Sequence, residues 1–208
     1  MIWINKGVEP IEWSEKKATP GFTKYEPIPA LRDALLEEQK NICAYCMRRI
    51  PVKDAGITES SKIEHLKSRH RHPALDRDYN NMVVCCPGSI DGSAHCDKSK
   101  AHEDLTFSPF NTAVQKSIAY STKDGTIKSS TPSWDTDINN VLCLNNARLK
   151  ETRAKVIEGV QKVLSQKKFS AKELNKMLTD WSTPTAKGYK PFCGVVIWYI
   201  EKKLKLLK

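Results

Sequence analysis

The residues in this chain best suited to chemistry are four cysteines and the polar side chains that lie between them. The cysteines form two pairs, Cys43 with Cys46 and Cys86 with Cys96. Four thiolates supply a complete tetrahedral zinc site, and a two-residue gap lets one knuckle of backbone present both sulfurs of the first pair. We therefore expect a structural zinc ion bound by these four residues.

The second pair leaves the choice of ligands open. Nine residues separate Cys86 from Cys96, an unusual gap for a zinc knuckle. Several residues in this gap turn freely, so the segment can loop out without moving either sulfur. These residues are Pro87, Gly88, Asp91 and Gly92. We favour Cys86, but Cys85 is an alternative, and His95 or His102 could replace a sulfur.

The side chains around the second pair suit phosphodiester hydrolysis. That reaction needs a nucleophilic water, a cation that bears charge on the phosphate oxygens, and groups that aim both. Glu64 and Asp97 offer the oxygen ligands that Mg²⁺ or Mn²⁺ takes, while His65 titrates near neutral pH and can accept a proton from water. Asn81 can hydrogen-bond to the histidine segment. Neighbours on a strand point to opposite faces, so Glu64 and His65 can share a site only with a local twist or bulge.

Positive charge is concentrated in two places. A basic cluster surrounds the candidate site and suits contacts that position a nucleic-acid backbone without reading bases. Its members are Lys62, Lys67, Arg69, Arg71 and Arg77, with His70 and His72 between them. The net charge of +10 arises in residues 146–208, where 15 Lys and Arg face 5 Asp and Glu. This basic third indicates a surface for an anion, nucleic acid first, or a lysine-rich solvated face.

The elements that must position these residues divide the chain into three parts. Residues 1–42 are expected to form an extended arm followed by a helix that starts at Pro29. Residues 43–105 are expected to form the nuclease core, with strands at 63–66 and 82–85 and a helix at 94–105. This order is a ββα unit. Zinc would replace the hydrophobic core that so small a unit lacks.

Residues 106–208 are expected to form a hairpin followed by a basic helical region. Asp124-Gly125 between two short apolar runs is a strong two-residue hairpin signal. Asn145 or Asn146 can cap the next helix, and Ser170 with Glu173 forms a capping box for another. A last helix begins near Pro191. The predicted fold class is therefore α+β, a zinc-stabilised ββα core between an N-terminal arm and a mainly helical C-terminal region.

Cysteine usage and hydropathy indicate a compartment. Seven cysteines, an odd number, and no apolar leader favour a reducing cytoplasm over a secreted disulfide scaffold. The longest apolar run, residues 195–200, is far shorter than the ~20 residues of a membrane span. We expect a cytoplasmic protein without disulfides that does not interact with a membrane.

The order of these motifs resembles the HNH, or ββα-metal treble-clef, endonuclease family. The shared pattern is a cysteine pair, an acid-His dipeptide, an asparagine five residues before the next cysteine, and a polar residue directly after the last cysteine. The resemblance implies that His65 is the general base, that Asn81 orients it, and that Glu64 and Asp97 bind the catalytic ion. The usual last residue is His or Asn, so Asp97 departs from the pattern. Lys100 matches a basic residue often found there and, with Lys67 and Arg69, is expected to contact phosphate.

The flanking sequences make the resemblance more specific, toward the PtuB nuclease subunits of Septu-type anti-phage systems. It covers most of the chain, although the last third matches only loosely. The segments that carry it are Ile4-Asn5-Lys6-Gly7 with Glu9-Pro10, Leu36-Glu37-Glu38-Gln39, Cys43-Ala44-Tyr45-Cys46, and Leu142-Cys143-Leu144-Asn145 before Arg148 and Arg153. In that family the nuclease partners an ATPase subunit, PtuA, and degrades DNA upon phage infection.

Three functions are consistent with the sequence. The first is a metal-dependent DNA endonuclease of a defence complex, with the arm and the C-terminal helices as candidates for the ATPase interface. The second is a non-catalytic zinc module in which the cysteines only shape a basic binding surface. The third is an RNA nuclease, because recognition of a 2′-hydroxyl requires a pocket that the sequence does not reveal.

Overall fold

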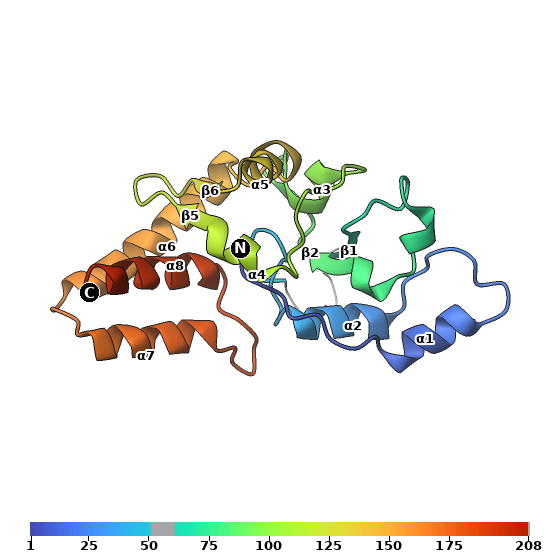
Figure 1. The fold of residues 1–208 in the computed structure, drawn as a ribbon, viewed down its shortest axis with the longest axis horizontal. Helices are drawn as coiled ribbons and strands as arrows, with labels where there is room; N and C mark the ends of the chain where they lie inside the picture. The colour runs from blue at the N-terminus through green and yellow to red at the C-terminus, as the bar shows by residue number, and fades with distance from the viewer. Residues whose placement is uncertain (51–60, 208) are drawn as a thin grey trace.

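The computed structural model describes residues 1–50 and 61–207, and it is a mixed α and β protein (Figure 1). The N-terminal part, residues 1–42, is not the extended arm that was predicted, because it contains a first helix, α1, Ile11–Ala18. Pro10 caps this helix, and its acidic first turn and basic last turn complement the helix dipole. Trp13 of α1 is completely buried, and α2, Pro29–Glu38, starts at the predicted proline.

The central part contains the two predicted strands and a shorter helix than predicted. β1, Lys62–His65, pairs antiparallel with β2, Met82–Cys85, from Lys62↔Cys85 to His65↔Met82. Two 3₁₀ turns, Pro73–Leu75 and Tyr79–Asn81, lie in the connection. α3, Cys96–Lys100, stops where Ala101 takes a φ of 48°, so the predicted helix at 94–105 is wrong in its second half.

The gap between the last two cysteines folds into a hairpin that the sequence interpretation described only as a loop. β3, Ser89–Ile90, pairs with β4, Ser93–Ala94. Asp91 and Gly92 at its tip have φ values of 49° and 82°, as a tight two-residue hairpin turn requires. The hairpin accommodates the extra residues without separating its two ends.

The C-terminal part begins with α4, Thr112–Ser117, and the predicted hairpin of β5, Ile118–Tyr120, with β6, Ile127–Ser129. A short helix α5, Pro132–Thr136, and a π-helical turn, Asp137–Val141, follow. The remaining elements are the three long helices. They are α6, Ala147–Ser165, α7, Ala171–Ser182, and α8, Cys193–Lys205.

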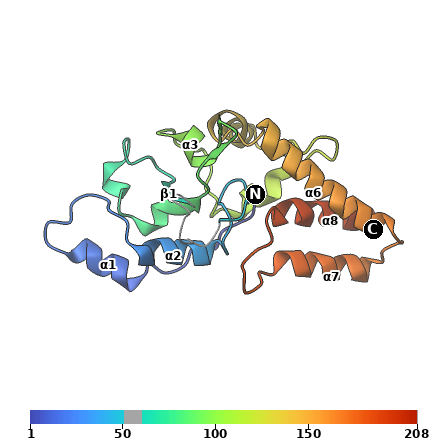
Figure 2. The same ribbon diagram turned by 180° about the vertical axis from the view of Figure 1, so that it is seen from behind.

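The predicted helix caps are confirmed. The Asn146 side chain accepts a hydrogen bond from the Leu149 amide at the start of α6, and Ser170 and Glu173 form both halves of the capping box of α7. Figures 1 and 2 show α8 between α6 and α7, and α8 contacts both helices. The last helix starts at Cys193, two residues after Pro191, and Phe192 before it has a left-handed conformation.

Buried residues from all three parts of the chain join in one hydrophobic core. The cysteine knuckle docks directly on the C-terminal region, where the Phe192 amide donates to the Met47 carbonyl at 3.0 Å. The division at residues 42 and 105 therefore stays a prediction. None of the helices in the described ranges has the length and apolar character that crossing a membrane demands.

Candidate metal centre and active-site cleft

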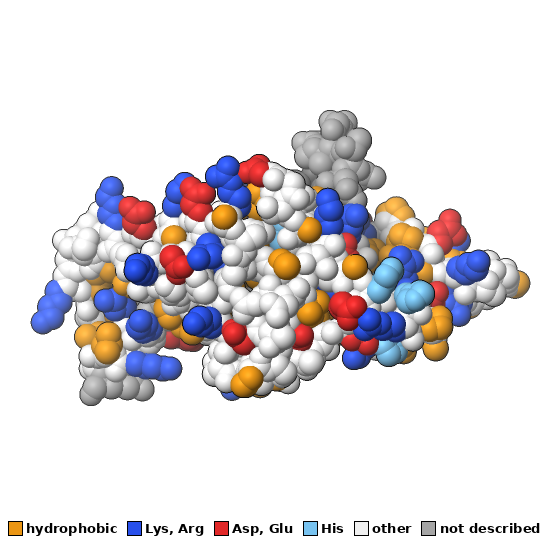
Figure 3. Space-filling model, turned by 90° about the horizontal axis from the view of Figure 1, so that it is seen from above, with side chains coloured by type: hydrophobic (Ala, Val, Ile, Leu, Met, Phe, Trp, Pro, Cys, Tyr) orange, Lys and Arg blue, Asp and Glu red, His pale blue; other side chains and the backbone are white. Residues whose placement is uncertain are grey.

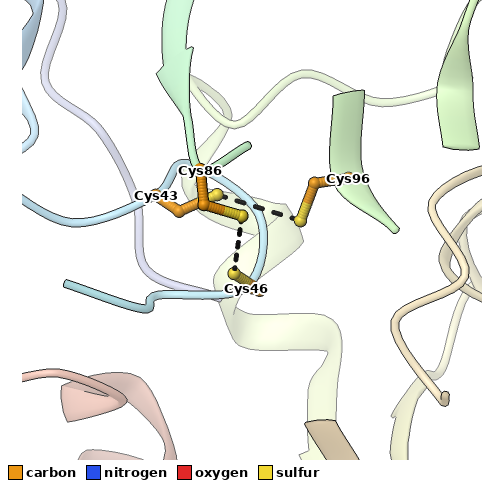
Figure 4. Close-up of side chains that lie close together, drawn as sticks. All are labelled: Cys43, Cys46, Cys86 and Cys96. Carbon is orange, nitrogen blue, oxygen red and sulfur yellow. Dashed lines mark hydrogen bonds between the residues drawn. The ribbon is translucent and has the colours of Figure 1, made fainter. Parts of the chain in front are cut away.

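The four predicted zinc ligands come together in the structure (Figure 4). Their sulfurs all lie within 4.8 Å of one another, and all four residues are buried. The Sγ atoms of Cys43 and Cys96 are 3.8 Å apart, and those of Cys46 and Cys86 are 3.7 Å apart. Sulfurs bound tetrahedrally at ~2.3 Å from one zinc ion are separated by about 3.8 Å. The cluster therefore has the composition and size of a structural zinc site.

The local sequence accounts for how each pair is presented. In the first pair the Met47 amide donates to the Cys43 carbonyl and the Cys43 amide to the Arg48 carbonyl, with Met47 at a φ of 62°. In the second pair the His95 amide donates to the Gly88 carbonyl at 2.8 Å and closes the hairpin. A side chain at Gly88, whose φ is 76°, would lie 2.7 Å from the His95 carbonyl oxygen. Glycine is required there by both conformation and space.

The structure also discriminates among the alternative ligands. Cys86 belongs to the group of four, whereas Cys85, although buried beside Cys43, does not. The Nε2 atom of His95 lies 3.5 Å from the Cys86 sulfur, so this histidine contacts a ligand instead of replacing one. His102 lies away from the sulfurs, with its ring 5.1 Å from that of His70.

Glu64, His65 and Asp97 line one cleft of about 570 Å³. Asp97 reaches it because the residue follows Cys96 directly, at the start of α3. β1 supplies the other two side chains, and its pairing with β2 contains no bulge. His65 is the last residue of β1, and the two residues that follow it form a bend. The three residues that the sequence selected thus share a single opening.

The His65 ring is hydrogen-bonded through one nitrogen, and the described residues provide no partner for the other. Its Nε2 atom lies 2.9 Å from the Asp76 carbonyl oxygen, which can only accept, so Nε2 carries the hydrogen. The Tyr25 ring packs edge-on with centroids 4.6 Å apart. Burial lowers the pKa of His65 to about 4, against the opposing effect of the Asp76 carbonyl. The Nδ1 atom therefore carries a lone pair at neutral pH, as a general base must, but a pKa of about 4 lies below the near-neutral value expected from the sequence and makes the imidazole a weaker base.

Lys100 has a different environment from the phosphate contact that was expected. Its Nζ atom lies 2.8 Å from Glu64 Oε1 and 2.9 Å from the His65 carbonyl oxygen, and its side chain is only 1% exposed. An ammonium group so enclosed is a partner of the protein's own carboxylate and cannot meet a phosphate from solvent. The predicted role of Lys100 as a phosphate ligand does not fit this placement.

The two carboxyl groups are crowded. Burial raises the pKa of Glu64 to about 8, a hydrogen bond with Asp97 raises it further in the same direction, and Lys100 opposes both. Two adjacent acidic groups favour a cation between them, and their oxygens are ligands for a hard divalent ion. Among the residues that the structure describes, only the cysteines form a group of three or more clustered ligands. Glu64 and Asp97 thus offer two oxygen ligands and belong to no larger ligand cluster within those residues.

Asn81 connects the segments on either side of His65. Its Oδ1 atom accepts from the Lys67 amide at 2.7 Å, and its Nδ2 atom donates to the Lys67 and Leu75 carbonyls at 3.0 and 3.1 Å. Leu75 precedes Asp76, whose carbonyl contacts the His65 ring. Asn81 thus makes the hydrogen bonds to the histidine segment that the sequence suggested, through the backbone of Lys67 and Leu75.

Of the other expected phosphate contacts, only Arg69 lies in the cleft. Its guanidinium stacks 4.8 Å from the centre of the Tyr25 ring. Lys67 lies outside, with its Nζ atom 3.8 Å from Asp104. Figure 3 shows histidines with nearby Lys, Arg, Asp and Glu side chains on the half of the molecule opposite the long helices. His70 of the basic cluster lines the cleft, and so do Lys98 and His102, to which the sequence did not assign a role there.

Comparison with known proteins does not assign the chain to a family. No protein-family model matches the chain, and no curated protein matches it either. The interpretation of the cleft therefore depends on the chemistry of the residues that line it.

Proposed function

We propose that this protein is a metal-dependent HNH-type endonuclease that hydrolyses phosphodiester bonds of DNA. The observation that supports it most is the neutral His65 ring, with a free nitrogen, in one cleft with Glu64 and Asp97. The adjacent sulfur cluster gives this small region a rigid support. A general base, two hard-ion ligands and a structural metal are the parts that metal-assisted hydrolysis requires.

In this proposal His65 Nδ1 accepts a proton from the attacking water. Glu64 and Asp97 would hold a Mg²⁺ or Mn²⁺ ion, which would supply positive charge for the phosphate oxygens. Arg69 at the rim contacts the phosphate backbone. Asn81 holds the segments of Lys67 and Leu75 in place. This keeps the Asp76 carbonyl against the His65 ring, and that carbonyl favours the tautomer with the hydrogen on Nε2.

The resemblance to PtuB subunits extends the proposal to biology. By that likeness the protein is the nuclease effector of a cytoplasmic anti-phage complex, and its partner is a PtuA-like ATPase. The N-terminal arm and the C-terminal helices are the surfaces that the likeness assigns to that partner.

The test is cleavage of supercoiled plasmid DNA with Mg²⁺ or Mn²⁺ by the purified chain, alone and with its ATPase partner. We expect nicked and linear products, and a loss of about 10²-fold or more in rate for His65→Ala, because proton transfer by a side chain contributes about that much. Zinc content should stay at the wild-type level. His72→Ala is the matched control, because His72 bonds Asp104 and does not line the cleft.

Two outcomes would contradict the proposal. Cleavage that persists in His65→Ala, or that is absent in every preparation including the complex, would favour the non-catalytic zinc module. Cleavage of single-stranded RNA with intact plasmid would favour the RNA nuclease.

A further inference from the structure

A second groove lies between α8 and the α4–β5 segment, and the N-terminal residue Trp3 completes its wall. Its volume is about 510 Å³, and it shares no lining residue with the cleft that contains His65. Hydroxyl and amide groups of Thr112, Gln115, Ser117 and Ser130 contribute to its surface. The groove therefore combines size and polarity that suit a ligand of its own.

The groove is positively charged. Lys116 of α4 and Lys202 and Lys205 of α8 line it, and all three are exposed. Within the described part of the chain, none of them forms an ion pair with a carboxylate, and Glu201 is the acidic residue among the lining side chains. Three lysines against one glutamate favour an anionic ligand.

Two indole rings stand among these lysines. Trp3 is 39% exposed, which is unusual for so large an apolar side chain, yet its Nε1 atom donates to the Phe110 carbonyl at 2.9 Å. Its backbone amide donates to the Gln115 side chain at 2.6 Å. Trp198 packs edge-on against Tyr120 with centroids 5.6 Å apart, and the Lys202 ammonium lies 5.3 Å from its ring. Both rings are thus held in place beside the positive charges.

We infer that this groove binds single-stranded nucleic acid. Aromatic rings that stack bases, interleaved with lysines that contact phosphates, are the features by which proteins bind single strands without reading sequence. A duplex offers its phosphates but keeps its base faces stacked, so it cannot use the indoles. An acidic peptide would use the lysines alone. The inference goes beyond the proposed cleavage and does not require that the cleft be catalytic.

The experiment is fluorescence anisotropy of a fluorescein-labelled oligonucleotide of ten thymidines titrated with the full chain. We expect Lys202→Glu/Lys205→Glu to weaken binding at least tenfold. Trp3→Ala should weaken it about tenfold, since loss of one stacked base costs ~1–3 kcal/mol. The charge-matched control is Lys172→Glu/Lys176→Glu on the exposed face of α7, which should bind as the wild type does.

Three results would overturn the inference. They are equal weakening by the groove and control variants, no effect of Trp3→Ala, and equal or tighter binding of a duplex or of a polyglutamate peptide. His65→Ala should retain oligonucleotide binding. Failure of the nuclease proposal would therefore leave this result intact, and failure here would leave plasmid cleavage intact.

Discussion

The region around the cysteines and the region of the three long helices are stabilised in contrasting ways. Between residues 61 and 105 the longest elements are two four-residue strands and a five-residue helix. The cluster of four buried cysteines, the buried pair of Glu64 and Lys100, and the hydrogen bonds of Asn81 connect these pieces. Short elements bury little apolar surface, so such a region depends on a few polar or metal contacts.

The helical region instead stabilises itself through repeated apolar contacts. α6 alone has 19 residues, and its stripe of Leu149, Ile157 and Val160 is buried against its neighbours. Side-chain caps accept hydrogen bonds from amides in the first turn of α6 and of α7. No single contact is indispensable to such a region. Loss of one group should therefore be severe near the cysteines and mild in the helices.

The largest effect should follow Cys43→Ser. Loss of a thiolate ligand removes the zinc, and structural zinc supplies about 10 kcal/mol or more to small metal-folded units. We expect no bound zinc by metal analysis and rapid hydrogen exchange of amides in β1 and β2, while amides in α6 to α8 remain protected. Cys143→Ser, outside the cluster, is the control and should change neither measurement. Slow exchange throughout Cys43→Ser would show that sulfur ligation is not what supports the region.

Lys100→Met should have the next largest effect. At pH 9, above the raised pKa of about 8 for Glu64, that carboxyl is ionised, and removal of its buried partner costs about 3–5 kcal/mol because the charge is left without a counter-ion. We expect a lower free energy of unfolding in urea denaturation, with zinc still bound. Lys98→Met, in the same helix but exposed, should change stability by less than about 0.5 kcal/mol. Equal stability of the two variants would place the Lys100 side chain outside the pair.

Leu149→Ala tests the helical region. The side chain is completely buried in α6, so its truncation should cost about 3 kcal/mol through lost burial and a residual cavity. Zinc content and the exchange of amides in β1 and β2 should stay unchanged, as measured by metal analysis and hydrogen exchange. Val163→Ala, at a position that is 43% exposed, provides the control with a smaller loss. Release of zinc by Leu149→Ala would mean that the two regions unfold as one.

The smallest effect should come from Ser170→Ala. It removes the side chain that accepts from the Glu173 amide, and loss of an N-cap costs about 1 kcal/mol. Thermal unfolding followed by circular dichroism should show a small decrease in midpoint. The comparison variant is Ser165→Ala, whose hydroxyl donates to the Lys162 carbonyl in the last turn of α6. A loss as large as that of Leu149→Ala would contradict the view that contacts in this region are distributed.

Local signals explain what the sequence predicted well. N-caps and the two-residue cysteine spacing are determined by residues that are neighbours in the chain, so Asn146, Ser170 and the knuckle were identified correctly. The hairpin around Asp124-Gly125 also forms, but Tyr120 pairs with Ile127, so residues 121–126, and not two residues alone, connect its strands. α1 was missed because the prolines around it suggested an extended arm, whereas Pro10 is the residue that begins the helix.

The site residues that were missed depend on distant contacts. Tyr25 packs against His65 from 40 positions away, and Asp76 contacts it through a backbone carbonyl, which residue type does not reveal. Lys100 was selected by its spacing from Asp97, but spacing does not determine whether an ammonium faces solvent or a buried carboxylate. Burial is a property of the assembled fold and not of the motif.

The β3–β4 hairpin offers a practical route to observe the metal centre. Gly92 at its tip has no neighbouring atoms within 4 Å of where a side chain would begin, whereas Gly88 at its base is tightly enclosed. A fluorophore or a short epitope introduced at the tip would therefore sit in open solvent, one strand away from Cys86 and Cys96. Such a reporter would follow metal uptake in real time while all four sulfurs stay native.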